Sequence, residues 1–115
     1  MDCIFCKIIA GETPTEILFQ DDRVTAFGDL HPKAPVHILI VPNKHIPSVN
    51  ELAAQDEGLI GHLFTIAARL AERQGIHQRG YRLVINTGPD AGQSVFHLHL
   101  HLIGGKPMPF ESPRE

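Results

Sequence analysis

Hydrophobic and polar residues alternate along several short segments of this 115-residue chain. Because side chains on a β-strand point to opposite faces with a period of two, such alternation predicts strands with one buried face. Strands are predicted at residues 16–20, 23–27, 36–41, 81–86 and 95–103. Two aspartates, Asp21 and Asp22, separate the first two segments, which indicates that these segments form a hairpin.

Apolar residues spaced three or four apart predict two helices. The first covers residues 3–10 and stops at Gly11, and the second covers residues 55–74 and stops at Gly75. Residues 48–51 (Ser-Val-Asn-Glu) fit a capping box, which is typical of a helix start. The order of helix, three strands, long helix and two strands predicts an α+β sandwich with a five-stranded, mostly antiparallel sheet.

Composition and charge narrow the class of protein. With 43% hydrophobic and 20% charged residues, the chain has the make-up of one ordinary globular domain. A formal net charge of −3 and the absence of any Lys/Arg run argue against a nucleic-acid-binding surface. No apolar stretch is long enough to cross a membrane and the N-terminus lacks a signal-peptide pattern, so we expect a cytoplasmic protein without a membrane partner.

Three histidines, His97, His99 and His101, alternate with leucines in the last predicted strand. On a strand these imidazoles would share one face, and imidazole can act as nucleophile, general acid or base, or metal ligand. A merely polar strand face would more naturally use Thr, Lys or Glu. Alternate residues lie roughly 6–7 Å apart along a strand, so the three imidazoles are poorly placed to bind one ion together. We therefore expect them to have different roles.

The loop before these histidines contains Gly92, Gln93 and Ser94. Successive backbone N–H groups in such a turn can bind an anion, and a hydroxyl adds a directional donor. Gly92 also tolerates the positive φ that such a turn often needs. Next to the histidines, this loop favours an oxyanion ligand, most plausibly a phosphate.

The two cysteines, Cys3 and Cys6, have the spacing of half a zinc site. His45 and His97 are the candidates for the remaining two ligands. The alternative is a pair of free cysteines that simply pack in the core. The other histidines, His31, His62 and His77, are expected to be solvated.

These motifs resemble those of the histidine triad (HIT) family, and specifically its Hint-like branch of nucleoside phosphoramidate hydrolases. The resemblance covers nearly the whole chain. It rests on Cys-Ile-Phe-Cys-Lys-Ile-Ile at 3–9, Ala-Phe-Gly-Asp at 26–29, Ala-Pro-Val-His at 34–37, Pro-Asn-Lys-His at 42–45, Gly-Tyr-Arg at 80–82 and Gly-Gln-Ser-Val-Phe-His-Leu-His-Leu-His-Leu-Ile-Gly-Gly at 92–105. The last segment is the most specific, because few families combine a Gly-Gln-Ser loop with alternating histidines.

The resemblance implies a catalytic role for four residues. His99 matches the histidine that attacks the α-phosphorus and becomes transiently nucleotidylated. His101 and His37 would hold the phosphate oxygens and tune His99. Ser94, with the backbone amides of Gln93 and Ser94, would contact the phosphate and help the leaving group to depart.

The resemblance also implies a nucleotide pocket and a zinc site. The pocket residues, besides those just named, are Asp29, which would accept hydrogen bonds from the ribose, Asn86, Gly92 and a base-binding wall of Phe5, Ile8, Phe27 and Leu30. In zinc-containing relatives the ligands match Cys3, Cys6, His45 and His97, so a structural zinc ion is expected. Gly28 stands where relatives often carry a larger residue, which leaves the preferred nucleoside open.

A HIT-like fold implies a domain at residues 1–105 and a C-terminal tail at 106–115. Members of this branch form homodimers in which two sheets join, and the tail reaches toward the site of the partner. Phe110 in this tail either shapes specificity or has no role.

The first functional hypothesis is hydrolysis of purine nucleoside 5′-phosphoramidates at the P–N bond, giving a nucleoside monophosphate and an amine. The first alternative is hydrolysis of dinucleoside polyphosphates, but relatives with that activity usually carry Gln where this chain has Leu100. The second alternative is a nucleotide- or zinc-binding regulatory module with little turnover, which would use the same residues.

Overall fold

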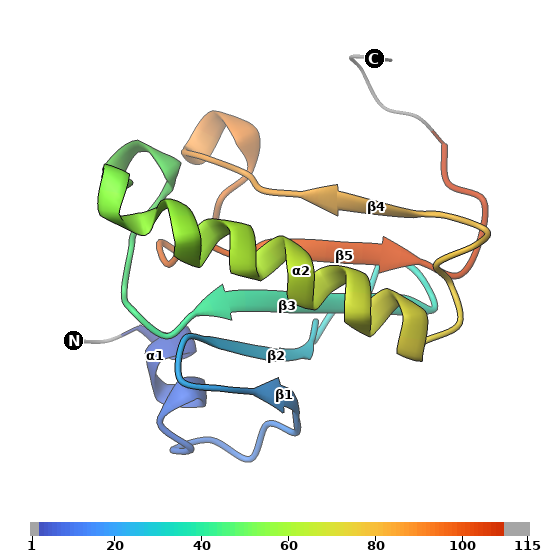
Figure 1. Cartoon of the computed structure of the whole chain (residues 1–115), viewed down its shortest axis with the longest axis horizontal. Helices are drawn as coiled ribbons and strands as arrows, with labels where there is room; N and C mark the ends of the chain where they lie inside the picture. Colours follow the sequence, from blue (N-terminus) through green and yellow to red (C-terminus); the bar gives the residue numbers. More distant parts are fainter. Residues whose placement is uncertain (1–2, 110–115) are drawn as a thin grey trace.

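A computed structural model describes residues 3–109 of the chain. Five antiparallel strands form one sheet in the order β1-β2-β3-β5-β4 (Figure 1). The strands are β1 (Ile17–Gln20), β2 (Val24–Gly28), β3 (Val36–Pro42), β4 (Tyr81–Val84) and β5 (Leu100–Gly104). The predicted α+β class and the five-stranded antiparallel sheet are thus confirmed.

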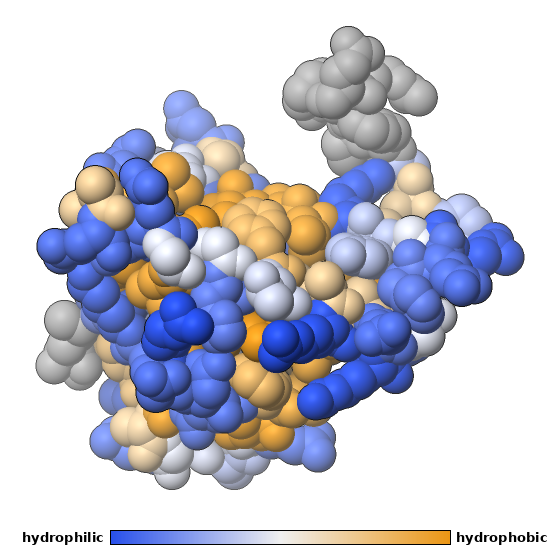
Figure 2. Space-filling view, viewed as in Figure 1, coloured by the Kyte–Doolittle hydropathy of each residue, from blue (hydrophilic) through white to orange (hydrophobic). Residues whose placement is uncertain are grey.

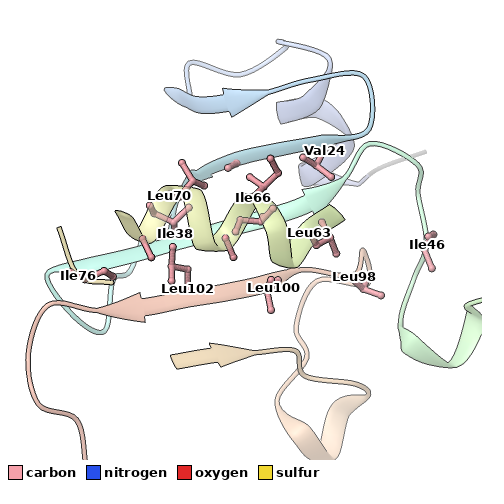
Figure 3. Packing of buried hydrophobic residues seen from close by; sticks show 14 residues of the cluster. Val24, Ile38, Ile46, Leu63, Ile66, Leu70, Ile76, Leu98, Leu100 and Leu102 are labelled. Atoms are coloured by element: carbon pink, nitrogen blue, oxygen red, sulfur yellow. The ribbon is translucent and has the colours of Figure 1, made fainter. Parts of the chain in front are cut away.

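Alternation along β3 separates two layers of packing. Ile38 and Ile40 belong to the main core, which lies between the sheet and helix α2 (Glu57–Arg73) (Figure 3). Leu39 and Val41 point to the opposite face and pack against helix α1 (Ile4–Ile9). His37 shares this second face, so the pattern of β3 places its imidazole on the side away from α2.

The capping box at residues 48–51 begins a short turn rather than the long helix. The Ser48 hydroxyl accepts a hydrogen bond from the Asn50 amide and donates one to Glu51 at 2.6 Å, which caps a 3-10 turn at Val49–Glu51. Extended backbone at Leu52 then ends this turn. A second turn, Ala54–Asp56, leads into α2.

The observed strand β5 is shorter than the strand that the sequence pattern predicts. His–Leu alternation predicts a strand from residue 95, but β5 begins at Leu100. The preceding segment leaves the ladder because the amide of Leu98 donates to the carbonyl of Ile46 at 2.7 Å. The three histidines therefore do not form one row on a strand: His97 is fully buried, and only His101 lies in β5.

His62, which we expected to be solvated, is paired. Its Nε2 lies 2.7 Å from Asp21 Oδ2 and connects α2 to the β1–β2 turn. Although desolvation raises the pKa of the Asp21 carboxyl, hydrogen bonds from His62 and from the amides of Val24 and Arg23 outweigh it and lower this pKa to about 2. The Asp21–Asp22 turn is thus fixed to the helix layer.

No helix within residues 3–109 is long and apolar enough to span a membrane. The predicted tail falls mostly beyond the described part of the chain: residues 106–109 follow β5, whereas Phe110 and residues 111–115 lie outside it.

Candidate active site and metal cluster

The backbone fixes the protonation of His99. Its Nδ1 lies 2.8 Å from the carbonyl oxygen of His97, and a carbonyl can only accept a hydrogen bond. Nδ1 therefore carries the proton in the neutral ring, and the lone pair is on Nε2. The Phe5 ring packs edge-to-face on the imidazole with centroids 5.1 Å apart, which restricts its rotation. The result is an oriented imidazole whose Nε2 lone pair has no hydrogen-bond partner within residues 3–109 and can act as a nucleophile.

His37 and His101 form a hydrogen-bonded pair beside His99. The backbone amide of Lys33 donates to His37 Nδ1 at 3.0 Å, so the proton of neutral His37 is on Nε2. This Nε2 lies 2.9 Å from His101 Nδ1 and 3.3 Å from Asp29 Oδ2. His101 then accepts at Nδ1 and carries its own proton on Nε2.

His101 stays neutral at physiological pH. Burial, and then the neighbouring imidazoles of His99 and His37, lower its pKa to about 4. Burial likewise lowers the pKa of His37. Since the rings of His99 and His101 lie 5.0 Å apart, a neutral His101 presents an N–H donor next to the His99 ring without adding a positive charge. This chain of hydrogen bonds suits the binding of an anion whose charge changes during reaction.

The Gly-Gln-Ser loop contains a 3-10 turn at Pro89–Ala91, and Gly92 has the left-handed φ of 91° that we anticipated. The amide of Gln93 donates to the carbonyl of Gly88 at 3.1 Å and is thus used inside the loop. Ser94 is exposed, and neither its amide nor its hydroxyl has a hydrogen-bond partner among residues 3–109. Ser94 therefore remains available to a ligand.

The candidate nucleotide residues are only partly brought together. Phe5, Ile8 and Phe27 form one buried cluster under the histidines, whereas Leu30 is 88% exposed and lies outside that cluster. Asp29 follows β2, accepts the His31 amide at Oδ1 and is joined to His37. Asn86 follows β4 and is half-buried.

The metal-ligand candidates Cys3, Cys6, His45 and His97 converge on one point. His97 Nδ1 lies 3.1 Å from His45 Nδ1, 3.4 Å from Cys3 Sγ and 3.6 Å from Cys6 Sγ, and Cys6 Sγ lies 3.4 Å from His45 Nδ1. Ligands 2.0–2.3 Å from a tetrahedral zinc ion are separated by about 3.3–3.8 Å, so this set has nearly the spacing of a zinc site.

The protonation of His97 also fits a metal. Its Nε2 donates to the carbonyl of Pro42 at 2.8 Å, so the Nδ1 lone pair points into the Cys/His cluster. Burial lowers the pKa of His97, which favours this neutral form. A second group, Asp29, His37 and His101, has metal-compatible spacing but not metal-compatible protonation. His37 uses its one lone pair to accept the Lys33 amide, so its Nε2 has none for an ion.

The family of this chain follows from comparison with known proteins. The family model of the HIT domain matches residues 10–108, which is most of the chain. The chain belongs to the HIT family. Purine nucleoside phosphoramidase of Escherichia coli K12 is 51% identical over 107 residues, covering 93% of this chain and 90% of that protein.

Solved HIT-family structures agree in fold. A HIT family hydrolase from Legionella pneumophila is 43% identical, with a TM-score of 0.93 over 95% of this chain and 97% of that one. A histidine triad protein from Clostridium difficile is 44% identical, also with a TM-score of 0.93, over 96% of both chains. The resemblance to the histidine triad family that the sequence motifs indicate is therefore confirmed.

Three site groups escaped the sequence reasoning because they are backbone atoms. The amide of Lys33 and the carbonyls of Pro42 and His97 determine which nitrogen of each histidine is protonated. No residue type signals these contacts. Only the positions of the histidines relative to β3 and to one another reveal them.

Proposed function

We propose that this HIT-family protein is a hydrolase that cleaves the P–N bond of purine nucleoside 5′-phosphoramidates. The observation that carries the proposal is the orientation of His99, whose Nδ1–H donates to the His97 carbonyl and whose Nε2 lone pair has no hydrogen-bond partner among residues 3–109. The phosphoramidase of Escherichia coli, at 51% identity, supports the choice of substrate.

In the first step, His99 Nε2 attacks the α-phosphorus and an N–P bond forms, while the P–N bond of the substrate breaks and the leaving nitrogen takes a proton from solvent to depart as the amine. The nucleotidylated imidazole is cationic and keeps its Nδ1–H, so its hydrogen bond to the His97 carbonyl becomes charge-assisted. Water then attacks the phosphorus and gives up a proton to solvent as the N–P bond breaks, which releases the nucleoside monophosphate and restores the His99 imidazole with its Nε2 lone pair.

The other groups stabilise charge on the phosphate. His101 presents its Nε2–H as the end of the hydrogen-bond chain from His37, and Ser94 offers a free hydroxyl and amide. Such preorganised donors stabilise the transition state more than the ground state. We assign the ribose hydroxyls to Asp29, since its partly exposed carboxylate adjoins His37.

We also propose that Cys3, Cys6, His45 and His97 hold a structural zinc ion. The spacing of their donor atoms and the inward lone pair of His97 support it. Bound zinc supplies a cross-link between the start of α1 and the segments that carry the two histidines. Cys3 and Cys6 are free cysteines, and thiols are kept reduced in the cytosol, which supports our proposal that the protein acts in the cytoplasm.

A homodimer is the proposed assembly. Within the described sheet β4 is an edge strand with half-buried side chains, and α2 exposes 41% of Phe64. Figure 2 shows apolar residues gathered over α2 and β4. An edge strand beside an apolar surface can pair with a second copy and extend the sheet. Sedimentation equilibrium is expected to give twice the chain mass, and a monomer mass at micromolar concentration would contradict the proposal.

The proposed activity is tested by comparing two substrates. With adenosine 5′-phosphoramidate we expect AMP release at a kcat/KM at least about tenfold higher than with diadenosine tetraphosphate, a difference of about 1.4 kcal/mol in barrier height. Denaturant quenching followed by mass spectrometry should place an adenylyl adduct on His99. Faster cleavage of the tetraphosphate would support a polyphosphate hydrolase, and AMP binding without turnover would support a regulatory module.

A further inference from the structure

The Gln93 side chain is buried and hydrogen-bonded within the protein, although it belongs to the loop that we propose binds phosphate. It is 4% exposed. Its Oε1 accepts the Gly88 amide at 2.9 Å, and its Nε2 donates to the carbonyls of Pro47 and Val95 at 2.8 and 3.1 Å. Both N–H bonds of the carboxamide and one of its acceptor sites are thus satisfied by backbone groups.

These three partners belong to separate segments. Gly88 begins the loop, just before its 3-10 turn, Pro47 lies two residues after the candidate ligand His45, and Val95 lies two residues before His97. One buried side chain therefore joins the loop to both histidine-bearing segments. These partners, two backbone carbonyls and one backbone N–H, match the two donors and the acceptor of a carboxamide side chain. A carboxylate has no donor, and an apolar side chain has neither donor nor acceptor.

Two hydrogen bonds of Gln93 hold the backbone on either side of Ser94. On one side, the backbone amide of Gln93 donates to Gly88, and on the other, the Gln93 carboxamide binds the Val95 carbonyl. Ser94 itself has no hydrogen-bond partner in the described chain that would hold it. The position of its hydroxyl therefore depends on its neighbours, and above all on Gln93.

We propose that Gln93 is a positioning residue, which acts through Ser94 by holding the 88–95 loop so that the Ser94 hydroxyl faces the phosphate. The inference rests on the proposed function. Gln93 makes no contact with the substrate through its side chain, because its polar atoms are already paired and buried. Its contribution is preorganisation, which affects the transition state more than ground-state binding.

A double-mutant cycle between Gln93 and Ser94 tests this role. Gln93→Met keeps the length of the side chain but removes all three hydrogen bonds. We expect kcat for adenosine 5′-phosphoramidate to fall about 10- to 100-fold with little change in KM, the pattern of a lost transition-state interaction. In a Ser94→Ala background the same substitution should lower kcat less than about threefold. The proposal would be overturned if Gln93→Met lowered kcat by the same factor with and without Ser94→Ala, or if Gln93→Met alone left kcat unchanged.

Gln93→Glu provides a second readout that a general loss of folding would not produce. Glutamate keeps the acceptor for Gly88 but places a carboxylate against two carbonyl oxygens, and only its protonated form can donate to one of them. Its kcat relative to the wild type should therefore recover several-fold as pH is lowered from 8 to 5.5. The corresponding ratio for Gln93→Met should stay flat, and a flat ratio for both variants would count against the role of the donors.

Two controls separate this proposal from the proposed function. Gln78→Met changes an exposed glutamine outside the site and should leave kcat unchanged. Calorimetric titration with AMP is run on every variant. If the wild type binds AMP but does not turn over the phosphoramidate, the proposed function fails. The Gln93–Ser94 cycle is then measured on AMP affinity, and losses of binding free energy that simply add would overturn the positioning role.

Discussion

Replacing His99 with alanine is expected to lower kcat for adenosine 5′-phosphoramidate by at least about 10³-fold, since removal of a covalent nucleophile commonly costs that much or more. The variant loses the Nε2 that would form the N–P bond, and no other nitrogen replaces it. His101 Nδ1 accepts from His37, and its Nε2 carries a proton. Steady-state release of AMP measures the effect.

Binding should survive this substitution. The phosphate would still meet Ser94 and His101, so we expect the Kd for AMP, measured by calorimetry, to change less than about tenfold. His77→Ala is the matched control, because His77 is exposed and belongs to neither the His37–His99–His101 group nor the Cys/His cluster. Retained turnover in the His99 variant, or an adenylyl adduct on another residue of the wild type, would contradict the assignment of the nucleophile.

Much of the sheet could be predicted because alternation along β3 is a local property. Each apolar residue from Ile38 to Val41 packs on the face that a period of two assigns to it. The same alternation failed before β5. Whether residues 95–99 join a ladder depends on the carbonyls of Ile46 and Pro42, which bind the Leu98 amide and the His97 ring from a distant segment. Local periodicity carries no information about such partners.

The sequence named residues that the structure brings together, but not their detailed contacts. The Cys3–Cys6 spacing and the alternation of His97, His99 and His101 indicated two groups of chemical residues, whereas His37 and Asp29 were added only by the resemblance to the HIT family. The roles of individual atoms depend on long-range backbone contacts, such as the Lys33 amide at His37. Gln93 illustrates the same limit: a polar residue in a glycine-containing loop looks like a ligand contact, yet its side chain is buried by three segments that the sequence does not connect.

Removing zinc from the Cys/His cluster is expected to destabilise the protein strongly. A ligand present at 1,000 times its Kd stabilises the folded state by about 4 kcal/mol, so chelation should lower the free energy of unfolding by about that amount. For a domain of this size the melting temperature should fall by roughly 15 °C. Without the ion, four polar donors converge with only weak mutual hydrogen bonds, and α1 loses its cross-link to His45 and His97.

Metal analysis and thermal unfolding with and without chelator measure this effect. Cys6→Ser should remove the metal and make unfolding insensitive to the chelator, whereas Lys7→Ala, an exposed change on the same helix, should preserve both. Because His97 presents Nδ1 to the cluster and its carbonyl to His99, loss of the ion should also lower kcat. If the wild type as purified holds no metal and the chelator does not change its melting temperature, Cys3 and Cys6 only pack in the core.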